Sequence, residues 1–217
     1  RQQFYPATAQ RGYQESAPFS KWEGLRCEAM QAIAKAGGKI KYGHSEVGNI
    51  REESLEMEQH EIEFLPVAIE DAADQIAIAK WMLRMIGYKY GVTISFAPKI
   101  VVGHAGSGLH IHTRLVKDGK NTMIEENQLS DIAKKAIAGY LTLAPSLTAF
   151  GNTVPTSYLR LVPHQEAPTN ICWGDRNRSV LVRVPLGWLN VKDMARAANP
   201  QEKGASSAFT DTQTVEF

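Results

Sequence analysis

The stretch KIKYGHSE, residues 39–46, alternates apolar or aromatic residues with polar ones, which is typical of a β-strand. The alternation places Tyr42, His44 and Glu46 on one face of that strand. A second strand is expected a short way along the chain, in QHEIEFLP at residues 59–66. Because strands this close in sequence favour antiparallel pairing, we expect an α+β fold in which an antiparallel β-sheet packs against helices.

Three helices are expected where apolar residues recur at helical spacing. The first spans residues 21–35 with Ser20 as its predicted N-cap, and the others span 70–91 and 130–150. The remaining expectations are strands at 92–97, 109–115 and 179–185, a hairpin turn at 117–120, and polar loops at 48–58 and 187–210.

The composition indicates an ordinary globular chain. The 217 residues are 43% hydrophobic and 22% charged, which is enough to bury a core without disulfides. The formal net charge of +1 gives no strong field for nucleic acid or an anionic membrane, and we expect neither partner. No apolar run approaches the ~20 residues of a membrane span. Cys27 and Cys172 are predicted to be free thiols in a reducing compartment, so we expect a cytoplasmic protein.

Carboxylate and imidazole side chains recur on three of the predicted strands. Glu46 lies on the first strand, and Glu61 and Glu63 lie on the second. His110 and His112 lie on a third, where their spacing makes them project together. Carboxylates beside an imidazole suit Mg²⁺ or Mn²⁺, which prefer oxygen ligands. The same spacing also fits surface charges beside a buried histidine.

Arginines gather in a stretch with little predicted regular structure. The set is Arg160, Arg176, Arg178 and Arg183, with Glu166 among them, and a glycine-rich loop with Gly103, Gly106 and Gly108 lies upstream. Backbone amides at glycines can approach an anion closely, and arginines near a divalent metal stabilise phosphoryl transfer. The loop matches neither the P-loop nor the Rossmann pattern, so a nucleotide would bind in another way. The alternative is a solvated charged loop.

Six short motifs occur in a fixed order along the chain. They are HSEV (44–47), EQHEI (58–62), GSGLHIH (106–112), the segment 152–163 ending in SYLRLVP, EAP (166–168), and NRS (177–179) followed by RVP (183–185). A last element, VEF, occupies 215–217. Together they resemble the catalytic domain of the glutamine synthetase family. The resemblance implies the fold shared with guanidino kinases, two Mg²⁺ or Mn²⁺ sites, and ATP as a substrate.

The resemblance also implies a role for each matched residue. The implied metal ligands are Glu46, Glu61, His110 and Glu216, and the implied glutamate-binding residues are Gly106, Arg160 and Arg178. The implied contacts to ATP are His112, Arg176 and Arg183. Glu166, Arg160 and Arg178 would be catalytic, with Glu166 on a flap that closes over the intermediate and helps to form the ammonium site.

The implied reaction joins ammonia to glutamate through γ-glutamyl phosphate, which is made from ATP. The implied partners are glutamate, ATP, ammonia and further copies of the parent protein in a ring-forming homo-oligomer. Because only 45 residues precede Glu46, we expect residues 1–217 to be a single truncated catalytic domain that lacks the family's N-terminal β-grasp domain. Such a fragment is expected to be inactive alone, and to be a monomer or a small oligomer.

Three other interpretations remain open at this point. A γ-glutamyl-amine or polyamine ligase would use the same chemistry with another acceptor. A non-catalytic relative is expected to lose the metal ligands, which are all present. A guanidino kinase would need a reactive cysteine, and Cys172 lies near the arginines. Two departures from the family pattern are the 15-residue separation of Glu46 and Glu61 and the presence of Arg114, where many members carry serine.

Overall fold

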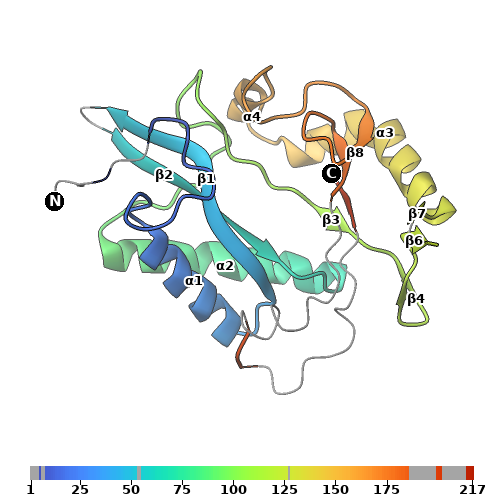
Figure 1. Cartoon of the computed structure of the whole chain (residues 1–217), viewed down its shortest axis with the longest axis horizontal. Coiled ribbons are helices and arrows are strands. Elements are labelled where there is room, and N and C mark those ends of the chain that lie inside the picture. Colours follow the sequence, from blue (N-terminus) through green and yellow to red (C-terminus); the bar gives the residue numbers. More distant parts are fainter. Residues whose placement is uncertain (1–4, 6–7, 53–54, 127, 186–198, 202–213) are drawn as a thin grey trace. The chain divides into compact units, whose positions relative to one another are not determined.

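A computed structural model describes residues 5, 8–52, 55–126, 128–185, 199–201 and 214–217. The chain divides into two compact units, and each is described by itself (Figure 1). The first unit comprises Arg1–Phe96 and Lys192–Ala205, and the second comprises Ala97–Val191 and Ser206–Phe217. Most of the predicted loop at 187–210 lies outside the described residues.

The first unit contains a long hairpin and two helices (Figure 1). In chain order its elements are α1 (Glu23–Lys35), β1 (Ile40–Glu52), β2 (Leu55–Phe64) and α2 (Ile69–Tyr90). The helices α1 and α2 pack on each other, and α1 also packs on β1. A small core of Ile33, Ala34, Ile40 and Ala79 lies among these elements.

The antiparallel hairpin of β1 and β2 extends further than the sequence predicts. The segment 48–58 was expected as a loop, but its described residues, 48–52 and 55–58, continue the two strands, with Arg51 opposite Glu56 in the ladder. The prediction was wrong because charged side chains also alternate on a solvated strand, where opposite charges can pair across it. Arg51 and Glu56 form such a pair, with 3.5 Å between the guanidinium and the carboxylate.

Helix α1 begins differently from the prediction. Ser20 does not cap it; the carboxylate of Glu58, on β2, instead accepts hydrogen bonds from the backbone amides of Lys21 and Trp22. A side chain from the hairpin therefore satisfies amides at the start of the helix. Helix α2 confirms the predicted helix at 70–91, and it ends at Gly91, whose φ of 69° is the left-handed conformation expected of a C-terminal glycine.

The second unit contains a small mixed sheet and two helices. Its elements are β3 (His112–Thr113), β4 (Val116–Lys117), β5 (Lys120–Asn121), β6 (Ile124–Glu125), β7 (Gln128–Leu129), α3 (Asp131–Gly151), α4 (Pro155–Arg160), β8 (Trp173–Asp175), β9 (Val182–Val184) and β10 (Val215–Glu216). The sheet has the order β3-β10-β9-β8, in which β10 is antiparallel to both neighbours and β8 is parallel to β9. The predicted α+β class is confirmed.

The core of the second unit joins the sheet to helix α3. It consists of Met123, Ala133, Ile137, Val182, Val184 and Val215. Ser130 caps α3, because its hydroxyl accepts a hydrogen bond from the amide of Ala133. The predicted turn at 117–120 is also present as the β4–β5 hairpin, with Asp118 and Gly119 both at positive φ.

Two strand predictions differ from the structure. Residues 92–97 form no strand, and the strand expected at 109–115 is limited to β3. Both segments are rich in β-forming residues, but residue types alone do not make a strand, which also needs a regular ladder with a neighbouring strand. Cys27 and Cys172 are free, as predicted. Among the described residues, no helix has both the length and the apolar character to span a membrane.

Candidate active site

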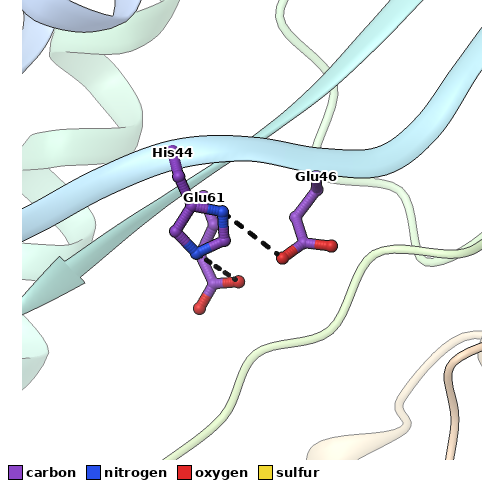
Figure 2. A group of neighbouring side chains, drawn as sticks. All are labelled: His44, Glu46 and Glu61. Carbon is purple, nitrogen blue, oxygen red and sulfur yellow. Dashed lines mark ion pairs between the residues drawn. The ribbon is translucent and has the colours of Figure 1, made fainter. Parts of the chain in front are cut away.

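Three side chains of the β1–β2 hairpin form a cluster of potential metal ligands. Figure 2 shows His44 and Glu46 on β1 with Glu61 of β2 beside them. The Nδ1 atom of His44 lies 3.6 Å from a carboxylate oxygen of Glu46, and its Nε2 atom lies 3.9 Å from one of Glu61. One ligand atom from each residue lies within 4.8 Å of the others, which is close enough for one cation to contact all three.

The strand geometry explains how these residues meet. His44 lies directly opposite Glu61 in the antiparallel ladder. Glu46 follows His44 by two positions, and side chains two apart on a strand share a face. The ladder is irregular between Ser45 and Asn49, so Glu46 lies outside the regular pairing. The backbone amide of Val47 donates to the Glu46 carboxylate at 3.0 Å, which orients that side chain.

Neighbouring groups hold the His44 ring in place. Tyr42 stacks on it with 5.7 Å between ring centroids, and Tyr13 contacts it edge-on at 5.3 Å. The Nδ1 atom lies 2.9 Å from the carbonyl of Ser45, so a proton on Nδ1 would donate to that oxygen. This tautomer leaves the lone pair of Nε2 on the side of Glu61, where it can bind a cation.

The donor set fits a divalent cation such as Mg²⁺ or Mn²⁺. It offers two carboxylates and one imidazole, and the side chains are 15% (His44), 21% (Glu46) and 37% (Glu61) exposed, so a cation and its waters can reach them. His44 was absent from the residues predicted as ligands, although its place two positions before Glu46 on the predicted strand was a usable signal. Glu63, also considered from the sequence, pairs with Lys41.

A second cluster lies in the sheet of the other unit, around Glu216 on β10. This carboxylate is 5% exposed, and Arg183 on β9 donates to both of its oxygens at 2.7 Å. His110 and His112 also approach it, at 3.5 and 3.7 Å from carboxylate oxygens. A cation at this cluster would therefore compete with Arg183 for Glu216, while the two imidazoles remain as further ligands.

The protonation of His110 suits such a ligand. Loss of solvent around the ring lowers the pKa of His110; Glu216 opposes this shift, and the positive charges of Arg160 and Arg183 add to it. The side chain still has 39% of its surface exposed. A neutral imidazole with an open edge can bind a metal, whereas an imidazolium cannot.

Arg160 lies across the glycine-rich loop. A Cβ atom at Gly106 would lie 2.7 Å from Cγ of Arg160, and one at Gly108 would lie 2.7 Å from its guanidinium. Only glycine at these positions lets the arginine pass so close to the backbone. Arg160 is 9% exposed, its Nε atom has no hydrogen-bond partner among the described residues, and burial lowers its pKa. A buried guanidinium of this kind is suited to a carboxylate ligand.

The other predicted site residues are solvent-exposed. Glu166, Arg176 and Arg178 are all exposed, and the first two have positive φ angles of 56° and 54°. Arg176 lies 3.9 Å from the carboxylate of Asp175. In the part of the chain that the structure describes, neither Glu166 nor Arg176 forms a hydrogen bond or ion pair with the Arg183–Glu216 pair. The structure thus brings together His44 with Glu46 and Glu61, and Arg183 with Glu216, His110 and His112.

Comparisons with known proteins identify the family of the chain. A family model described as the catalytic domain of glutamine synthetase matches residues 2–199. The chain is 39% identical over 177 residues to the glutamine synthetase of Thermus thermophilus, covering 80% of this chain and 38% of that protein. It is 37% identical over 191 residues to that of Mycolicibacterium smegmatis, covering 87% and 38%.

The fold also has a counterpart among solved structures. A cryo-electron microscopy structure of glutamine synthetase from Plasmodium falciparum superposes with a TM-score of 0.77, at 24% identity, over 99% of this chain and 37% of that one. The chain spans about two fifths of the length of the curated relatives it matches. The chain belongs to the glutamine synthetase family, and its residues 2–199 match the catalytic domain of that family.

Proposed function

We propose that this chain contributes part of the active site of an ATP-dependent ligase that joins ammonia to the γ-carboxylate of glutamate. The observation that carries the proposal is the His44–Glu46–Glu61 cluster, which presents a divalent-cation donor set on the hairpin of a glutamine synthetase-family domain. The proposal includes Mg²⁺ or Mn²⁺, ATP, a cytoplasmic location and a ring-forming homo-oligomer, as the family resemblance implies.

The metal ligands would come from both clusters. His44, Glu46 and Glu61 would hold one cation, and His110 with Glu216 would contribute to a second. When bound, such cations neutralise negative charge on carboxylate and phosphate oxygens, which otherwise keeps two anions apart. Arg183 would then lose part of its hydrogen bonding to Glu216 and donate to phosphate oxygens. The guanidinium would therefore stay hydrogen-bonded to an anion throughout.

The remaining residues would bind the organic substrates. Arg160, whose buried guanidinium lies over Gly106, would donate to a carboxylate of glutamate while the loop backbone holds the rest of the molecule. Arg176, Arg178 and His112 would donate to ATP phosphates and to the transferred phosphoryl group. Because phosphoryl transfer spreads charge over the phosphoryl oxygens, these donors stabilise the transition state more than the ground state.

The proposed reaction has two steps. An oxygen of the glutamate γ-carboxylate attacks the γ-phosphorus of ATP, the bond to the β-phosphate oxygen breaks, and ADP leaves. The nitrogen of ammonia then attacks the γ-carbonyl carbon of γ-glutamyl phosphate, the carbon–oxygen bond to phosphate breaks, and inorganic phosphate leaves with glutamine as the product. Glu166 would accept a proton from bound ammonium before the attack, which frees the nitrogen lone pair, and a second proton would leave the nitrogen with the departing phosphate. Glu166 would also help to exclude water from the acyl phosphate.

Assays on the natural full-length protein test this function. We expect glutamine from glutamate, ATP, Mg²⁺ or Mn²⁺ and ammonium, and γ-glutamyl hydroxamate when hydroxylamine replaces ammonium. Glu166→Ala should slow amide formation at least tenfold while it changes ATP affinity less than threefold, because the side chain acts after phosphorylation. Formation of products only with alkylamines or polyamines would redirect the proposal to an amine ligase, and no product with any acceptor would refute it.

A further inference from the structure

The proposed chemistry leaves one buried cation of the second unit without a role. Lys99 is 6% exposed and lies between helix α2 and the glycine-rich loop in sequence. Its ammonium donates to the side-chain oxygen of Gln165 at 2.7 Å, and it also donates to the backbone carbonyl of His104. These two acceptors belong to segments 61 positions apart, so one side chain connects two separate parts of the unit.

Burial of this ammonium is unfavourable without those contacts. An ammonium loses hydration when it is buried, and only good hydrogen bonds offset the loss. Loss of solvent lowers the pKa of Lys99, and the nearby charge of Arg160 lowers it further. The position of the side chain therefore depends on its two oxygen acceptors, rather than on apolar packing alone.

Each acceptor lies next to a residue with a proposed substrate role. His104 lies two positions before Gly106, in the loop whose Ser107 amide donates to the Pro98 carbonyl at 2.9 Å. Gln165 lies directly before Glu166. The loop and the turn therefore both have a fixed point within two residues of the positions that would contact glutamate and ammonium.

The turn that carries Glu166 needs such a fixed point. His164 and Glu166 have φ angles of 61° and 56°, so two non-glycine residues on either side of Gln165 adopt the left-handed conformation. This conformation is unfavourable for residues with a Cβ atom and persists only when surrounding contacts impose it. The Lys99–Gln165 bond is a contact to the residue between them.

We infer that Lys99 is a positioning residue that ties the turn carrying Glu166 to the glycine-rich loop. The structural part of the inference stands on the contacts of Lys99, and its consequence for catalysis rests on the proposed function. The lysine ammonium is compact and lies on a flexible side chain, so it can donate to two acceptors in different directions. The planar guanidinium of arginine or a neutral side chain does this less well. Loss of the tie should leave glutamate binding measurable but let water reach the acyl phosphate.

Two isosteric variants test the tie in the full-length protein. Lys99→Met removes both bonds, and Gln165→Met removes only the bond to the turn. In both variants we expect the ratio of phosphate released to glutamine formed to rise roughly tenfold, the equilibrium factor of one hydrogen bond to a charged group. The double variant should match Lys99→Met alone, because both changes break the same contact. Lys135→Met, at an exposed lysine of α3, is the matched control and should keep the wild-type ratio.

Hydrogen exchange gives a second readout that needs no glutamine formation. The amides of Ser107 and Val162 donate hydrogen bonds to the carbonyls of Pro98 and Arg160. Their hydrogen exchange, measured with millisecond labelling times, should be several-fold faster in both variants and unchanged in Lys135→Met. If wild-type protein forms no glutamine but exchange behaves as expected, the proposed function fails and the tie stands. The positioning role of Lys99 is refuted if Gln165→Met changes neither the product ratio nor the exchange rates, or if the effects of the two single variants add in the double variant. Gln165→Met keeps this test valid even if Lys99→Met does not fold.

Discussion

Replacement of Arg183 by methionine should destabilise the second unit strongly. Arg183 donates to both oxygens of Glu216 at 2.7 Å, on adjacent strands β9 and β10. The Glu216 side chain is 7% exposed and that of Arg183 is 25% exposed. Methionine has a similar length and no charge, so it removes the two charged hydrogen bonds and leaves a buried carboxylate beside two imidazoles.

The burial of the pair sets the size of the effect. Removing one partner of a buried ion pair costs about 3–5 kcal/mol, because the other charge stays buried without compensation. Partial exposure of Arg183 and the nearness of His110 and His112 place the expected loss at the lower end, about 3 kcal/mol. The Lys134–Asp131 pair of α3 provides the contrast: it is 61% and 84% exposed, so Lys134→Met should cost less than about 0.5 kcal/mol.

Urea titrations, monitored by the hydrogen exchange of peptides from the second unit, measure the loss of stability in Arg183→Met and in Lys134→Met. The double variant Arg183→Met/Glu216→Met should be less destabilised than Arg183→Met alone, since it leaves no unpaired charge behind. A buried ion pair of this strength is excluded if Arg183→Met lowers the free energy of unfolding no more than Lys134→Met does. It is also excluded if adding Glu216→Met to Arg183→Met lowers the free energy of unfolding again by a similar amount.

Three further substitutions change the free energy of unfolding, which urea titration measures: two glycine replacements have opposite effects, and one glutamate replacement has a pH-dependent effect. Gly106→Ala should lower the free energy of unfolding by about 1–3 kcal/mol, because the new Cβ would lie 2.5 Å from the Pro98 carbonyl. Gly139→Ala, in open space on α3, should raise the free energy of unfolding by about 0.5–1 kcal/mol. Equal effects of the two substitutions would show that crowding at Gly106 is not the cause. Burial alone would raise the pKa of Glu58, but the His60 imidazole, 3.4 Å away, and hydrogen bonds from two backbone amides outweigh it and lower the pKa below its ordinary 4.5. A lowered folded pKa means that the ionised carboxylate stabilises the fold above about pH 4.5 and that this stability is lost as the pH falls further. Glu58→Gln should therefore cost about 1 kcal/mol at pH 7, and the difference from wild type should shrink below pH 4.5; a constant difference would show that the charge is not involved.

Periodicity predicted the elements that depend on local sequence. The helices at 70–91 and 130–150 have apolar residues at helical spacing, and the first also has a terminal glycine, so both were located from sequence within a residue or two. The strand ends at 48–52 and 55–58 were missed because they are rich in polar and charged residues, a composition typical of a loop, whereas the backbone ladder that pairs them is not visible in the sequence. The prediction of a strand at 92–97 was wrong: its residue types favour a strand, but its residues join none of the sheets in the described part of the chain.

The site was predictable only where strand geometry fixes it. Alternation and antiparallel pairing bring Glu46 and Glu61 to the same part of the hairpin, and the same rule identifies His44. The pairing of Arg183 with Glu216 depends on the sheet order β3-β10-β9, which no local pattern encodes. Likewise, the contact of Lys99 with Gln165 spans 66 positions and follows from the tertiary fold.

Binding of Mn²⁺ to the protein is the sharpest test of a metal site on the β1–β2 hairpin. Titration followed by electron paramagnetic resonance should show a bound ion in the wild type, with affinity reduced at least tenfold in Glu46→Gln and in Glu61→Gln. Glu56→Gln, at a carboxylate of the same hairpin that is 43% exposed, should bind as the wild type does. Affinity unchanged by the first two substitutions, or reduced equally by all three, would contradict a metal site formed by His44, Glu46 and Glu61.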